Sequence, residues 1–135
     1  MKKLVGLLVI LSLWFVCGCD IRMIPKEEEK KELPFIILSE EVIPEEVKKL
    51  IEEKKEAEMK LTYVDEKYRY IVVGYGKQKT GGYSIYIDDL YATDNAVYLD
   101  TTLLGPKNKE LKENAPSYPV IVLRVMEMSL PVVFR

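Results

Sequence analysis

The residues best suited to chemistry lie in a glycine-rich stretch, "GYGKQKTGGYSIYI", which runs from Gly74 to Ile87. Its glycines, lysines and threonine are residue types that occur in phosphate-binding loops. A Walker loop requires Ser or Thr after its Gly-Lys pair, but Gly76 and Lys77 are followed by Gln78. A dinucleotide fingerprint begun at Gly74 requires a third glycine where the chain has Lys79. The stretch therefore predicts no nucleotide site.

Other catalytic patterns are also incomplete. The "KTG" at residues 79–81 is found in serine β-lactamases, but no serine of this chain has a lysine three places later, as their nucleophile motif requires. Histidine is absent, which removes the commonest general base and zinc ligand. The aspartates between residues 88 and 100 lack the spacing of a calcium loop. We therefore expect no enzyme activity, no metal and no cofactor.

The first residues, "MKKLVGLLVILSLWFVCGCD", read as a secretory signal. Lys2 and Lys3 precede an apolar run from residue 4 to residue 16, which is too short for a permanent membrane span of roughly 20 residues. The end of this segment, "VCGC", resembles the bacterial lipobox, in which a small residue precedes an acylated cysteine. We expect cleavage after residue 18 and a palmitate-type lipid on Cys19, which would anchor the protein to the membrane of the bacterial cell envelope, outside the cytoplasm. A plain secreted protein and an uncleaved anchor remain alternatives.

Cleavage would leave 135 minus 18, or 117, residues, which is the usual size of one domain. With Cys17 removed and Cys19 acylated, no thiol would remain for a disulfide or a nucleophile. Subtracting Lys2 and Lys3 leaves 18 basic against 22 acidic side chains, interspersed, which argues against nucleic acid as a partner. Residues 19–34 are mostly charged and predict a tether, and residues 35–135 predict a single domain.

Hydrophobic periodicity predicts one helix followed by strands. Residues 35–38, "FIIL", predict a short buried strand, and Pro44 predicts the start of a helix of about twelve residues with Val47, Leu50, Ile51 and Ala57 on its apolar face. From residue 60 the period becomes two, which predicts strands at the segments 60–64, 68–76, 82–92, 96–104, 118–128 and 130–134. The expected class is α+β, with one amphipathic helix packed on an antiparallel meander of about five strands. A mainly β, sandwich-like fold is the alternative.

The glycine-rich stretch would then close a hairpin. Its glycines allow positive φ and close backbone approach, which predicts that "GKQKTGG" joins strands ending at Tyr75 and beginning at Tyr83. The tip would be exposed and positively charged.

The same stretch, followed by "SYPVIVLRV", resembles the C-terminal domain of the PrcB family of protease complex subunits. The residues that carry the resemblance are Thr80, Gly81, Gly82, Tyr83 and Pro119, while Lys79 stands where the family usually has proline. The resemblance implies a non-catalytic exported lipoprotein that binds and stabilises or assembles a surface or extracellular protease complex.

Two other functions remain open: a protease inhibitor that inserts the loop into an active cleft, and an envelope lipoprotein that binds a small molecule or polymer. If the protein is a protease complex subunit, its protein partner is a secreted or surface protease. The residues expected to contact it are Lys77, Lys79, Thr80, Gly81, Gly82 and Tyr83, with Tyr118 and Pro119 beside them.

Overall fold

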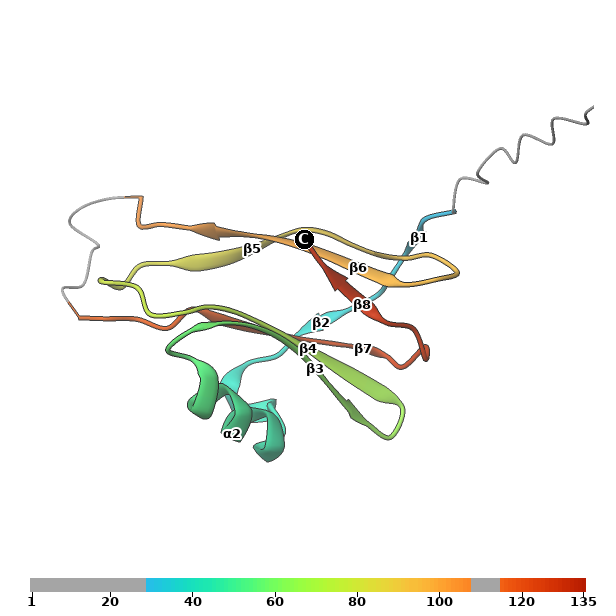
Figure 1. The fold of residues 1–135 in the computed structure, drawn as a ribbon, viewed down its shortest axis with the longest axis horizontal. Helices are drawn as coiled ribbons and strands as arrows, with labels where there is room; N and C mark the ends of the chain where they lie inside the picture. The colour runs from blue at the N-terminus through green and yellow to red at the C-terminus, as the bar shows by residue number, and fades with distance from the viewer. Residues whose placement is uncertain (1–28, 108–114) are drawn as a thin grey trace, which may run out of the picture.

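The computed structural model describes residues 29–107 and 115–135, which form a sandwich of two four-stranded sheets with one α-helix on its outside (Figure 1). One sheet has the order β1-β5-β6-β8 and the other β2-β7-β4-β3. Every pair is antiparallel except β6 with β8. The predicted signal peptide, Cys19 and the tether up to residue 28 lie outside the described residues.

Five long strands account for most of both sheets, and each of them overlaps one of the predicted segments. They are β3 (Glu58–Asp65), β4 (Tyr68–Tyr75), β5 (Ser84–Ala92), β6 (Val97–Leu104) and β7 (Val120–Met126). The short strands are β1 (Lys31–Glu32), β2 (Ile36–Ile37) and β8 (Val132–Phe134). The expected α+β class is confirmed, and the two sheets stack as the sandwich alternative describes.

The main core lies between the two sheets. Alternate residues of β5 and β6 point inward, so that Leu90, Val97 and Leu99 meet Ile71 and Leu123 of the opposite sheet. Leu99 is 1% exposed, and Ile71 and Leu123 are fully buried. Burying an aliphatic side chain of this size contributes about 1.5–3 kcal/mol, which makes this interior the chief source of stability.

A second core lies under the helix α2 (Glu45–Lys54), which covers the outer face of the β2-β7-β4-β3 sheet. Pro44 is its N-cap, and the acidic first turn complements the positive end of the helix dipole. Val47 is fully buried against Val72 and Val122. The helix ends at Lys54, so the prediction that Ala57 shares its apolar face is wrong; Ala57 lies beyond the last turn and is exposed.

The N-terminal part of the domain differs from expectation in two ways. The strand predicted at residues 35–38 exists, but it is not buried, because β2 has two residues and pairs with β7 alone. Ile36 and Ile37 are 52% and 55% exposed. Within the segment predicted as tether, β1 pairs with β5 and Leu33 joins the core. The folded part therefore begins before residue 35.

The hairpin predicted at residues 76–83 is also wrong. Strand β4 pairs with β3 and β7, whereas β5 pairs with β1 and β6, so these residues cross from one sheet to the other. The physical reason lies in β4 itself, whose residues Tyr70 to Gly74 are all buried, as a strand flanked on both edges requires. No free edge of β4 remains for β5.

Candidate partner-binding site

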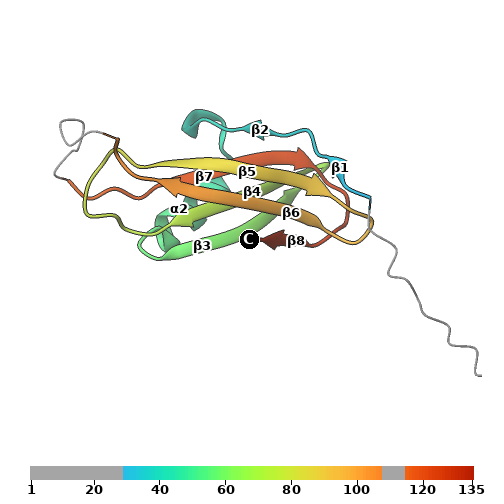
Figure 2. The same ribbon diagram turned by 90° about the horizontal axis from the view of Figure 1, so that it is seen from above.

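The residues predicted to contact a partner lie together at one end of the sandwich. This end holds the β4–β5 connection, residues 76–83, and the segment 117–119 that leads into β7 (Figures 1 and 2). The opposite end holds β1 and the β3–β4, β5–β6 and β7–β8 turns. We refer to the first as the loop end and to residues 76–83 as the crossover loop.

Backbone hydrogen bonds brace the crossover loop against the segment 117–119. Gln78 N donates to Ser117 O at 2.8 Å, and Ser117 N donates back to Gln78 O at 3.1 Å. The Ser117 hydroxyl donates to Thr80 O at 2.6 Å, and Tyr75 N donates to Pro119 O at 3.2 Å. The crossover loop therefore lies beside the segment 117–119, held by main-chain hydrogen bonds and by the Ser117 hydroxyl.

Two glycines set the shape of the loop. Gly76 has φ 75° and Gly82 has φ 84°, in the region that L side chains rarely adopt. A Cβ on Gly76 would lie 3.1 Å from the backbone of Ala57 and of Glu58, just after α2. Lys77 N donates to Glu56 O at 3.2 Å, which adds a further tie to the same turn. The crossover loop is thus closely packed on the end of the helix layer.

The side chains of the predicted site differ in exposure. Lys77 and Lys79 are exposed, whereas Thr80, Tyr83 and Tyr118 are partly buried and Gly81 is buried. The Tyr83 ring packs over Gly105, where an added Cβ would lie 3.6 Å from Tyr83 Cε1. The groups most available to a partner are therefore the two lysines.

A cation from the helix joins the site, which sequence patterns did not predict. Lys55 Nζ lies 4.9 Å from the centroid of the Tyr118 ring, and 3.0 Å from Glu52 Oε2. The hydrogen bond to Glu52, with the nearby Glu52 and Tyr118 charges, raises the pKa of Lys55 above its ordinary value. Lys55 is therefore cationic at neutral pH. No spacing signal links residue 55 to residue 118, because only the tertiary fold brings the helix end to β7.

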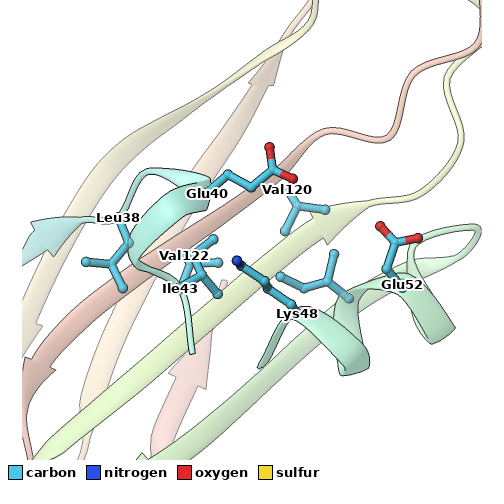
Figure 3. Close-up of a pocket in the computed structure, with 8 residues that line it drawn as sticks. Leu38, Glu40, Ile43, Lys48, Glu52, Val120 and Val122 are labelled. Carbon is cyan, nitrogen blue, oxygen red and sulfur yellow. The ribbon is translucent and has the colours of Figure 1, made fainter. Parts of the chain in front are cut away.

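A groove of about 360 Å³ lies on the helix layer, between the 3₁₀ helix η2 (Glu40–Val42), α2 and β7 (Figure 3). The lining residues are Leu38, Glu40, Ile43, Lys48, Ile51, Glu52, Val120 and Val122. Five of these are aliphatic and three are charged. Lys48 Nζ lies 3.5 Å from Glu45 Oε1, so its charge is offset within the helix. The groove can hold an apolar group beside carboxylates.

The described residues contain no group of three or more His, Cys, Asp or Glu placed to hold a metal ion. Asp89 faces Asp100 across the β5–β6 pair, and the adjacent Asp88 accepts a hydrogen bond from Thr102 Oγ1 at 2.5 Å. Over the same described ranges, no helix is long and apolar enough to cross a membrane.

The fold defines a helix-covered β-sandwich, with a braced, basic crossover loop at one end. Residues 69–126 match the family model described as PrcB C-terminal, from the second residue of β4 to the last residue of β7. Over these 58 of its 135 residues the chain is similar to the PrcB C-terminal domain, which confirms the resemblance noted from the sequence. Comparisons with curated proteins and with solved structures gave no match.

Proposed function

We propose that this protein is a non-catalytic subunit that binds a surface or extracellular protease and helps to stabilise or assemble its complex. The observation that carries the proposal is the PrcB C-terminal match. The resemblance noted from the sequence is to a family of protease complex subunits, so the match supports a role in such a complex. The match includes both segments of the loop end, residues 76–83 and 117–119.

The partner would contact the loop end through the crossover loop. Lys77 and Lys79 are exposed charges that would speed encounter with an acidic patch on the protease. The hydrogen bonds between Gln78 and Ser117 hold the loop in one shape before binding, which lowers the conformational entropy lost on association. Tyr83 and Tyr118 would add apolar contact area with a polar hydroxyl at the rim.

The proposal extends to location, with Cys19 as a lipid anchor in the bacterial cell envelope. Strand β1 pairs with the last residues of β5, while the crossover loop joins the first. The nine residues of β5 span about 30 Å at roughly 3.3 Å per residue. A chain anchored before β1 would therefore present the loop end away from the bilayer, toward other envelope proteins.

A crosslinking pull-down from the native envelope tests this function. We expect the wild-type protein to capture a protease as its major partner, and a Lys77→Ala/Lys79→Ala variant to capture less of it. Capture of no protease, with abundant capture of other proteins, would contradict the proposal.

A further inference from the structure

The groove on the helix layer has the size and composition of a binding site. Its volume of about 360 Å³ lies within the roughly 300–1,000 Å³ typical of sites that enclose small ligands. Its apolar wall comes from Ile43 before the helix, Ile51 in the helix and Val122 in β7. Figure 3 shows the Lys48 amine turned toward Ile43 and Val122, and Glu40 and Glu52 at the rim.

The surface around the groove is acidic. Residues 39–58 contain eight glutamates and four lysines, which gives a formal charge of −4, whereas the whole chain has −2. At the rim, the Glu40 carboxylate has no ion-pair partner within the described ranges, and the Glu52 side chain, which pairs there with Lys55, is 70% exposed. The negative electrostatic potential of these carboxylates attracts cationic groups and repels an anionic bilayer.

We propose that the groove binds a basic, apolar segment of a protein partner. An aliphatic side chain of that segment would lie against Ile43 and Val122, and a neighbouring Lys or Arg would pair with Glu40 or Glu52. The apolar contact supplies most of the affinity. The carboxylates select a segment that has Lys or Arg next to the buried aliphatic residue. This inference is independent of the protease-complex proposal, because it concerns a different surface and any protein bearing such a segment.

The test is titration of the full folded protein, ¹³C-labelled at Ile, Leu and Val methyl groups, with a capped Lys-Leu-Lys-Leu-Lys peptide. We expect saturable shifts at the lining methyls of Leu38, Ile43, Ile51, Val120 and Val122, and none at the exposed Ile36 and Ile37. A capped Glu-Leu-Glu-Leu-Glu peptide should leave these signals unchanged. Shifts spread evenly over the surface, equal binding of the acidic peptide, or the same shifts with phosphatidylglycerol vesicles would overturn the proposal.

Matched charge reversals separate the groove from the general acidic field. Glu40→Lys with Glu52→Lys changes two lining residues, whereas Glu41→Lys with Glu53→Lys makes the same change of net charge at neighbours that do not line it. We expect the first pair to weaken binding of the basic peptide roughly tenfold and the second pair much less, because only the first pair removes carboxylates that the lysines of the peptide would contact. Equal weakening by both pairs would show that no specific site exists.

Discussion

At the scale of single residues, Gly76 and Gly82 share a positive φ but differ in what surrounds them. Gly76 approaches the backbone of Ala57 and Glu58, where neither atom can rotate away from an added Cβ. We expect Gly82→Ala to lower the free energy of unfolding by about 1 kcal/mol, through backbone strain alone. Gly76→Ala should lower it further, because a steric clash adds to the strain. Chemical denaturation of both variants measures the difference, and equal loss at the two positions would refute this account of the crossover loop.

The two exposed lysines of the crossover loop give a second prediction. Lys77→Ala with Lys79→Ala removes two exposed side chains that form no ion pair with any residue that the structure describes, so the melting temperature should stay close to wild type. Association with the captured partner should weaken, most strongly at low salt, where long-range attraction is least screened.

The control for this pair is Lys49→Ala with Lys54→Ala, which makes the same change of net charge on the exposed face of α2. Binding measured at two salt concentrations distinguishes a contact at the crossover loop from a general effect of net charge. If both double variants bind alike, the crossover loop is not the contact.

At the scale of elements, the β7–β8 turn is held by one partly buried ion pair. Arg69 donates from Nε and Nη2 to the two carboxylate oxygens of Glu127 at 2.9 and 2.8 Å, and its Nη1 donates to Leu130 O. The two side chains are 14% and 16% exposed. Glu127 also accepts from Ser129 N at 2.5 Å, which fixes the positive-φ residue of the turn. The pair thus ties the β7–β8 turn to the start of β4.

Removing one partner of this pair should be costly. We expect Arg69→Met to lower the free energy of unfolding by about 1.5–3 kcal/mol, because Glu127 keeps its charge in a partly buried place with fewer donors. Adding Glu127→Gln to that variant should recover part of the loss. A double-mutant cycle by urea denaturation measures the coupling free energy between Arg69 and Glu127. A coupling free energy of zero would show that the ion pair contributes nothing to stability.

Which strands form was predictable, but which strands pair was not. Alternation at Ile85 and Ile87 of β5, and at Val97 and Leu99 of β6, marks the face that each strand buries, and the structure places these residues in the core. Alternation carries no information on whether β4 and β5 share a sheet. The glycine-rich composition of residues 76–83 fits a hairpin and a crossover between sheets equally well, because both need positive φ and close packing.

The site was predictable only in part for the same reason. Thr80 and Pro119 could be grouped from the family resemblance, and in the structure main-chain hydrogen bonds and the Ser117 hydroxyl hold their two segments together. The position of Lys55 beside Tyr118 and the groove at Ile43 could not be predicted, because both depend on where α2 packs on the sheet. The helix was expected from its periodicity, but its position on the sheet is a tertiary property.

At the scale of the whole molecule, membrane attachment through Cys19 should be independent of the stability of the folded domain. Cys19→Ala removes the proposed lipid attachment without changing any described residue of the fold. We expect the variant protein to leave the membrane fraction while the purified domain keeps its wild-type melting temperature. Cell fractionation with immunoblotting decides this, and a variant retained on the membrane at the wild-type level would contradict the lipid-anchor proposal.

We propose that the protein is a non-catalytic subunit that supports a protease. The most direct test adds the purified domain in increasing amounts to the protease captured from the envelope and follows both complex formation and the half-life of proteolytic activity. We expect the two proteins to co-elute, and we expect proteolytic activity to be unchanged at the start and to last at least as long as without the domain. A loss of initial activity in proportion to the added domain would show an inhibitor instead, and no co-elution at any ratio would contradict the claim outright.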